Sequence, residues 1–193
     1  MTFNLIIAGV GGQGTVLASK LIAAAAMKKG FDVRTAETIG MAQRGGSVFG
    51  HIRIGENIFS PLVPLGKADA LIAFEPSEAV RQLAYLSRDG AVITCDSAVQ
   101  PGGMSGSYET SVMMDYLKEK TLKLFLADGA KLKEQNAKTL NVCLLGAAAQ
   151  CGIFPFDAGT LRETLTEVLP RSFHEMNLKA FELGIKLFNE NKY

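Results

Sequence analysis

Short, mainly apolar runs recur along the chain with the length of buried β-strands. They cover residues 3–8, 69–74, 91–95 and 122–127. Because apolar and polar residues do not alternate strictly in these runs, they are typical of parallel strands covered on both faces. Parallel strands need a crossover between them, and a helix capped by Ser77 is expected between the second and third runs.

Longer segments with helical spacing separate or follow these runs. One helix is expected from Thr15 to Lys28-Lys29-Gly30, where two cations and a glycine suit a helix end, and others over residues 139–150, 158–169 and 172–189. The last segment has too many apolar residues for one narrow stripe. It is therefore expected either to be widely buried or to meet another chain in part, including a second copy of this one.

Two more polar segments complete the expected sheet. Residues 32–36 are predicted to form a strand that ends at Glu37. Residues 47–54 alternate in part before Gly55-Glu56-Asn57, which predicts an antiparallel hairpin into Ile58-Phe59. The whole pattern predicts one α/β domain over residues 1–193 with three layers, a mostly parallel sheet, an antiparallel hairpin excursion and C-terminal helices.

The composition narrows the class of protein. Of the 193 residues, 48% are hydrophobic, and the formal net charge is +1. Lysines and arginines are scattered, so no nucleic-acid or membrane surface is expected. The N-terminus lacks a secretory pattern and no apolar stretch has the length of a membrane span, which favours a cytoplasmic protein.

Few residue types suited to catalysis are present. The three cysteines, Cys95, Cys143 and Cys151, have no paired spacing and are expected to be buried thiols. The two histidines, His51 and His174, lack partners at metal-ligand spacing. Hydrolase elbow, zinc-protease and Walker motifs are missing from the sequence. We therefore predict no catalytic residue and no metal site.

One glycine-rich segment, Gly9-Val10-Gly11-Gly12-Gln13-Gly14, lies between the first expected strand and the first helix. Its glycines fit the spacing G-x-G-x-x-G, and a strand, tight turn and helix in this order leave backbone amides open to phosphate or another anion. Glu37 ends the next strand, where a dinucleotide site would hold the ribose hydroxyls. Two interpretations stay open: a nicotinamide or flavin nucleotide site, or glycines that only allow close packing of helix on strand.

A second unusual segment is Gln43-Arg44-Gly45-Gly46. The planar guanidinium of Arg44 beside exposed amides suits a carboxylate or phosphate, although the arginine can equally brace its loop or contact another chain. The candidate ligand-binding residues are therefore Gly9, Gly11, Gly12, Gln13, Gly14, Glu37, Gln43, Arg44, Gly45 and Gly46.

Motifs along nearly the whole chain resemble the gamma subunit, or gamma domain, of 2-oxoacid:ferredoxin oxidoreductases. They are the glycine-rich segment and residues 37–48, 51–55, 60–62, 66–71, 74–79, 141–146 and 177–184. Residues 41–48 and 74–76 most resemble the indolepyruvate branch, in which the equivalent chain is called beta. That branch often has histidine where this chain has Ile39, so indolepyruvate, pyruvate, branched 2-oxoacids and 2-oxoglutarate all stay open as substrates.

The resemblance implies one subunit of an assembly that converts a 2-oxoacid to an acyl-coenzyme A and passes electrons to ferredoxin. Thiamine diphosphate and iron–sulfur clusters are expected in partner subunits, because this sequence lacks the Gly-Asp-Gly to Asn-Asn pattern of a thiamine-diphosphate site and its dispersed cysteines lack cluster spacing. This chain would be inactive alone and would supply an interface and an anion-binding loop, for which coenzyme A is the family ligand with a suitable pyrophosphate. The competing interpretations are a stand-alone NAD(P)- or FAD-binding oxidoreductase or sensor, and a purely structural subunit.

Overall fold

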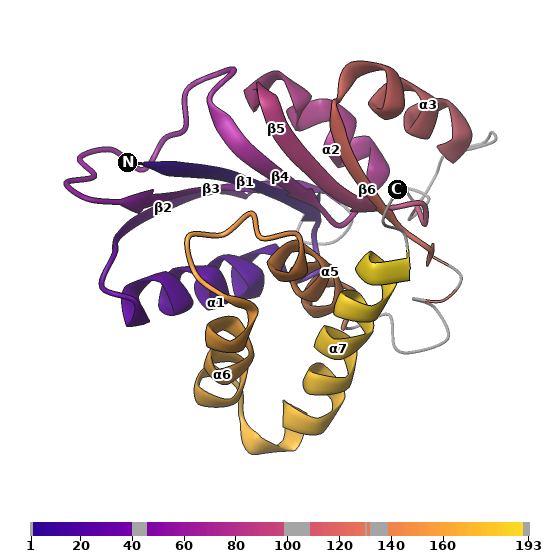
Figure 1. The fold of residues 1–193 in the computed structure, drawn as a ribbon. Helices are drawn as coiled ribbons and strands as arrows, with labels where there is room; N and C mark the ends of the chain where they lie inside the picture. The colour runs from indigo at the N-terminus through magenta and orange to yellow at the C-terminus, as the bar shows by residue number, and fades with distance from the viewer. Residues whose placement is uncertain (1, 40–45, 99–108, 130, 132–138, 191–193) are drawn as a thin grey trace.

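A computed structural model describes residues 2–39, 46–98, 109–129, 131 and 139–190 (Figure 1). The strands are β1 (Phe3–Val10), β2 (Asp32–Ile39), β3 (Ser47–Gly55), β4 (Ala68–Ala73), β5 (Leu86–Cys95) and β6 (Lys123–Ala127). The α-helices are α1 (Thr15–Lys28), α2 (Pro76–Gln82), α3 (Thr110–Lys120), α5 (Leu140–Gln150), α6 (Ala158–Val168) and α7 (His174–Glu190), and short 3-10 turns cover Leu83–Tyr85 and Arg171–Phe173.

The strands form one six-stranded sheet in the order β2-β3-β1-β4-β5-β6. Parallel pairing joins β1, β4, β5 and β6, whereas β3 runs antiparallel to both β1 and β2. The predicted mostly parallel sheet with an antiparallel element is therefore confirmed. The predicted hairpin partner was wrong, because residues 58 and 59 form no strand and β3 pairs instead with the strands on either side of it.

The residue pattern explains why β3 is an inner strand and β2 is an outer one. Most side chains of β3 are buried, and they alternate between its two faces. By contrast, no described side chain of β2 is buried, and its sequence DVRTAETI is largely polar. A strand at the edge of a sheet tolerates such exposure, whereas a strand covered on both faces does not.

Helices cover the sheet on both faces and make three layers. Helices α2 and α3 lie on one face, and α1, α5, α6 and α7 lie on the other (Figure 1). Alternate residues of β1 enter separate cores: Leu5 and Ile7 pack on the α1 and α5 side, and Ile6 and Ala8 pack on the α2 and α3 side. The three-layer prediction is thus confirmed, and no helix in the described ranges is long and apolar enough to cross a membrane.

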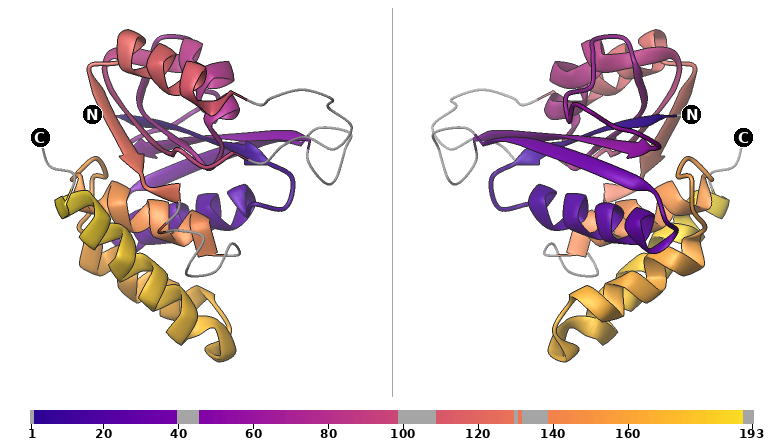
Figure 2. Two further views of the ribbon diagram at one scale, coloured as in Figure 1. Left: turned by 90° about the vertical axis from the view of Figure 1, so that its right-hand side faces the viewer. Right: turned by 90° about the vertical axis from the view of Figure 1, so that its left-hand side faces the viewer.

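The C-terminal helices pack on the domain through α5. Figure 2 shows α6 and α7, in orange and yellow, projecting away from the sheet. Helix α5 is buried along almost its whole length, and α7 crosses it so closely that a Cβ at Gly146 would overlap the Phe181 carbonyl and one at Gly184 would overlap the Cys143 carbonyl. Glycine is thus required at both positions of this crossing.

The last helix has one fully buried stripe rather than wide burial. Its buried residues are Asn177, Ala180, Phe181, Gly184 and Leu187. Leu183, Ile185 and Phe188 are half-buried against the same core. Most of its apolar residues thus pack within the domain, and contact of this helix with a second copy stays a prediction.

The helix after β4 begins differently from the prediction. Ser77 is not the N-cap; Glu75 is, and its carboxylate accepts a hydrogen bond from the Ser77 amide at 2.6 Å. Pro76 occupies the first helical position, which suits proline because that amide has no helical partner, and it holds Glu75 in an extended conformation. The cap is therefore a buried carboxylate that lies at the carboxyl end of β4.

Candidate functional site

The glycine-rich turn lies at the carboxyl end of β1 and leads directly into α1. Gly12 and Gly14 have φ angles of 101° and 79°, a region that side-chain-bearing residues rarely adopt. Gly14 is the N-cap of α1 and offers no side-chain cap, so the first amides of the helix have no capping partner in the described chain. The predicted strand, turn and helix are therefore present, with glycine at the positions where the backbone requires it.

The turn is braced by its own glutamine. Gln13 Oε1 accepts the Val10 amide at 2.8 Å, and Gln13 Nε2 donates to the Phe74 carbonyl at 3.2 Å, which links the ends of β1 and β4. A Cβ at Gly9 would lie 2.8 Å from Gln13 Oε1 and 3.0 Å from Thr15 Cγ2. Gly9 and Gln13, two of the predicted ligand-binding residues, thus have a clear role in closing the turn.

Only part of the turn's backbone is open to a ligand. The Gly11 amide donates to the Gly46 carbonyl at 2.8 Å, and the Gln13 amide donates to the Val10 carbonyl at 3.1 Å. The amides of Gly12 and Gly14 make no hydrogen bond within the described part of the chain. These two amides and the first turn of α1 are the donors that an anion could use.

Asn141 supports the turn from a distant part of the sequence. It is buried at the start of α5, where its Nδ2 donates to the Gly14 carbonyl at 3.3 Å and its Oδ1 accepts the Val142 amide at 2.8 Å. A Cβ at Gly14 would overlap Asn141 Nδ2. In the sequence, Asn141 could have been noticed as a polar residue at the start of an otherwise apolar helix. Its hydrogen bond to Gly14 could not be predicted, because the two residues lie far apart in the chain.

Two buried carboxylates, Glu75 at the N-cap of α2 and Glu78 in its first turn, lie at the same edge of the sheet. Ser47 Oγ, at the start of β3, donates to Glu78 Oε2 at 2.6 Å, and Arg81 Nη1 lies 3.6 Å from Glu78 Oε1. Burial raises the pKa of Glu78 despite these partners. Together with the Gly11 to Gly46 hydrogen bond, the Ser47–Glu78 bond fixes the start of β3 beside the turn.

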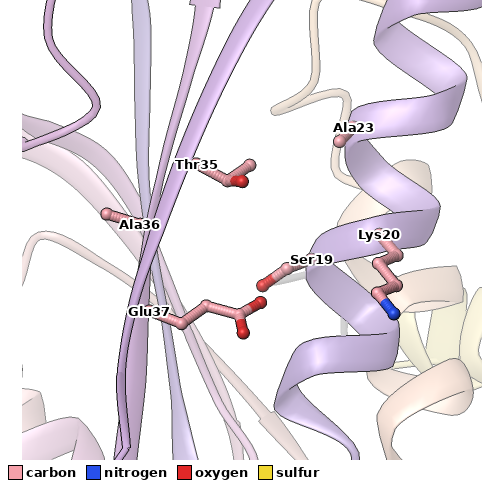
Figure 3. A pocket seen from close by; sticks show the side chains of 6 residues that line it. All are labelled: Ser19, Lys20, Ala23, Thr35, Ala36 and Glu37. Atoms are coloured by element: carbon pink, nitrogen blue, oxygen red, sulfur yellow. The ribbon is translucent and has the colours of Figure 1, made fainter.

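Glu37 does not face the glycine turn. Its partner on β3 is Gly50, and Gly50 pairs with Ile7 on β1, so a whole strand separates Glu37 from the strand that carries the turn. Figure 3 shows its carboxylate pointing toward Ser19 on α1. In a dinucleotide site the acid ends the strand next to β1, and the sheet order here differs from that arrangement.

Of the second predicted segment, Gln43-Arg44-Gly45-Gly46, the structure describes only Gly46. Gln43, Arg44 and Gly45 lie outside the described residues. Gly46 lies beside the glycine turn, where its carbonyl accepts the Gly11 amide. The structure therefore brings Gly46 together with Gly9, Gly11, Gly12, Gln13 and Gly14, and places Glu37 elsewhere.

The cysteines and histidines have structural surroundings. Cys95 and Cys143 are buried, which raises the pKa of their thiols to about 11 and about 12, whereas Cys151 is half-buried. The Nδ1 atom of His51 accepts the Val63 amide at 3.2 Å, and burial lowers the pKa of this histidine. His174 Nε2 lies 2.7 Å from the Leu169 carbonyl oxygen. Of the three thiols that were expected to be buried, the prediction is confirmed for Cys95 and Cys143 and was wrong for Cys151, which is only partly buried.

The fold and this sheet edge match one family along most of the chain. The model of the pyruvate ferredoxin/flavodoxin oxidoreductase family matches residues 4–187, and the chain belongs to that family. The chain is 36% identical to indolepyruvate oxidoreductase subunit IorB of Thermococcus kodakarensis, over 97% of this chain and 96% of that protein. It is 38% identical to the IorB subunit of Pyrococcus horikoshii with the same coverage. It is 28% identical to the pyruvate/ketoisovalerate oxidoreductases common subunit gamma of T. kodakarensis, over 90% of each chain.

Solved structures show the same fold at lower identity. The gamma subunit of a keto/oxoacid ferredoxin oxidoreductase from Geobacter sulfurreducens aligns with a TM-score of 0.71 at 21% identity, over 100% of this chain and 99% of that one. A 2-oxoglutarate:ferredoxin oxidoreductase from Magnetococcus marinus aligns with a TM-score of 0.73 at 22% identity, over 99% of this chain and 32% of that one. The resemblance to gamma subunits that the motifs indicated is therefore confirmed.

Proposed function

We propose that the chain is the non-cofactor-bearing subunit of a 2-oxoacid:ferredoxin oxidoreductase complex. The complex would oxidatively decarboxylate a 2-oxoacid such as indolepyruvate or pyruvate to an acyl-coenzyme A, with electrons passing to ferredoxin. The proposal is supported by similarity over nearly the full length to proteins named as subunits of such oxidoreductases. Indolepyruvate is favoured because the IorB relatives reach 36–38% identity, against 28% for the pyruvate/ketoisovalerate subunit.

The proposed division of labour follows from the side chains of this chain. Thiamine diphosphate and iron–sulfur clusters in partner subunits would supply the decarboxylation and the electron transfer. Within the described ranges, no group of three or more His, Cys, Asp and Glu side chains is placed to hold a metal. The role left for this chain is to bind an anionic group and to contact its partners, and we expect it to be inactive alone.

The observation that carries the binding proposal is the open part of the glycine turn. The Gly12 and Gly14 amides and the uncapped first turn of α1 form a concentrated set of donors at the carboxyl edge of the sheet. We propose that they hold the pyrophosphate of coenzyme A, with Arg44 as a cationic partner and Gln43, Gly45 and Gly46 shaping the loop. Gly9, Gly11 and Gln13 keep the turn in shape for this binding.

An exposed apolar segment supports the subunit role. The connection between β3 and β4 carries Phe59, Leu62 and Leu65, whose side chains are 95%, 57% and 66% exposed. Large apolar side chains gathered on one surface segment are typical of a surface that another chain covers. The segment thus favours a chain that works in an assembly.

Coenzyme A titration of the assembled complex tests the binding proposal. We expect Gly12→Val and Arg44→Ala each to weaken coenzyme A binding at least tenfold by calorimetry. Gly30→Val is the matched control, because Gly30 also has a positive φ, of 85°, and open space around it, but ends α1 far from the turn. Unchanged affinity in both site variants would exclude coenzyme A from the turn.

The subunit proposal is tested separately by purification from the native host. A tagged chain should co-purify with a partner that contains thiamine diphosphate and the visible absorption of iron–sulfur clusters. Recovery of the chain without such a partner would remove the subunit proposal. The alternative, a stand-alone NAD(P)- or FAD-binding oxidoreductase or sensor, predicts instead that these nucleotides raise the melting temperature of the isolated chain.

A further inference from the structure

A hollow lies between β2 and α1, away from the glycine turn. It has a volume of about 330 Å³ and is lined by Ser19, Lys20, Ala23, Thr35, Ala36 and Glu37. Figure 3 shows Ser19, Thr35 and Glu37 directed into the space between the strand and the helix. Because β3 separates β2 from β1, this hollow is distinct from the proposed coenzyme A site.

The hydroxyl of Ser19 is the unusual group in this hollow. Ser19 is only 2% exposed, and its Oγ has no hydrogen-bond partner among the described residues. Buried hydroxyls in folded proteins almost always have a partner, from the protein or from a bound molecule. Gly50 on β3 lies close to this hydroxyl, since a Cβ there would lie 3.3 Å from Ser19 Oγ.

The carboxylate in the hollow limits the class of molecule that fits it. Glu37 takes part in no ion pair within the described part of the chain, whereas the Lys20 ammonium is directed away from the space between the strand and the helix (Figure 3). The carboxylate disfavours an anion and accepts hydrogen bonds from donors on a bound molecule. Ser19 and Thr35 add two hydroxyls, each of which donates and accepts. The lining therefore suits a molecule without negative charge that has several hydroxyl groups.

We propose that this hollow binds a vicinal diol, as found in a free pentose or in the ribose of a nucleoside. Two neighbouring hydroxyls can both donate to the Glu37 carboxylate while accepting from the hydroxyls of Ser19 and Thr35. A ribose with both hydroxyls free meets this requirement, whereas a phosphate on either hydroxyl would face the carboxylate. None of the described lining residues is aromatic, so the diol rather than a stacked base provides the recognition.

Titration of the isotope-labelled full chain with small probes tests the inference by NMR. Adenosine and D-ribose should each shift the amide signals of Ser19, Thr35 and Glu37 in a saturable way, and 2'-deoxyadenosine should bind at least tenfold more weakly than adenosine. Equal binding of adenosine and ribose would assign recognition to the sugar alone, and tighter binding of adenosine would add a contact from the base. Equal affinity of the deoxy probe, saturation by glycine but not by ribose, or no saturable shift would overturn the proposal.

Two variants and a matched control locate the binding. Ser19→Ala and Glu37→Gln should each weaken adenosine binding at least tenfold while the circular dichroism spectrum stays unchanged. Thr94→Val is the control, because Thr94 Oγ1 is also buried without a partner among the described residues but does not line the hollow. Equal effects of Ser19→Ala and Thr94→Val would refute the assignment.

Diol binding in the hollow and coenzyme A binding at the glycine turn can be tested independently of each other. Loss of coenzyme A binding in Gly12→Val with intact diol binding, or the reverse in Ser19→Ala, would show that the two sites are independent. A chain that binds coenzyme A but no diol loses only this inference. A chain that binds the diol but not coenzyme A loses only the proposed role of the glycine turn.

Discussion

Replacing Gly14 by alanine should destabilise the protein through two effects that can be measured apart. The first is backbone strain: a φ of 79° costs a residue with a Cβ about 1–3 kcal/mol. The second is overlap of the new Cβ with Asn141 Nδ2, which adds about 1–3 kcal/mol because the asparagine is buried and held by two hydrogen bonds. The unfolding free energy should therefore fall by about 4 kcal/mol.

Two further variants separate these effects. Gly12→Ala has a comparable backbone cost at a φ of 101°, but nothing lies near its Cβ, so we expect a loss of about 2 kcal/mol. Asn141→Ala removes two hydrogen bonds and should cost about 2 kcal/mol alone. In the double variant of Gly14 and Asn141 the overlap is gone, so its loss should be smaller than the sum of the single losses by about 1–3 kcal/mol.

Urea denaturation followed by far-ultraviolet circular dichroism measures the unsubstituted protein and the four variants. The slope of the transition must stay constant for the comparison to hold, since a changed slope indicates a changed denatured state. A loss in Gly14→Ala no larger than that in Gly12→Ala, or effects of Gly14→Ala and Asn141→Ala that add without coupling, would contradict the overlap between Gly14 and Asn141.

Three other outcomes follow from the packing and the shifted pKa values. Gly184→Ala should lower the unfolding free energy by about 3 kcal/mol in the same assay, because its Cβ overlaps the Cys143 carbonyl where α5 and α7 cross; a loss near zero would contradict the close crossing. Burial raises the pKa of Glu78, so its contribution to stability is present below the ordinary value of 4.5 and is lost as the pH rises. Urea titrations at several pH values should show that Glu78→Gln, which keeps an acceptor for Ser47, removes this decline, and a parallel pH dependence in both proteins would count against it. Burial lowers the pKa of His51, so stability should fall as the pH drops below the ordinary value of 6.5, and His51→Gln should reduce that slope if the histidine is the cause.

Local patterns predicted the parallel half of the fold well. The apolar runs that became β1, β4 and β6 and the helices α1, α5, α6 and α7 were expected close to their observed bounds, whereas β5 begins five residues before the expected run of residues 91–95. Helix α3 was missed because only Met114 and Leu117 are buried on it, which leaves a weak apolar pattern. The antiparallel strand was expected, but its partners depended on pairing between distant segments, which periodicity does not encode.

At the candidate site, the sequence identified the turn but not its supports. Glycine spacing located the turn because φ angles near 80–100° exclude other residues. The contacts of Gln13 with Phe74, of Asn141 with Gly14 and of Glu78 with Ser47 join residues far apart in the chain. Only the folded arrangement brings these residues together, so they could not be predicted from spacing.

The outer position of β2 restricts how this protein can associate with others. Strand β2 ends the sheet, so one row of its amides and carbonyls is not used by β3 and is a template for pairing with another strand. Asp32, Arg34 and Glu37 are exposed along it, and such charges discourage edge-to-edge addition and the fibrous aggregates to which it leads. Addition of a strand at the β2 edge is therefore disfavoured, and contacts with other chains on this side of the sheet are directed toward side-chain surfaces.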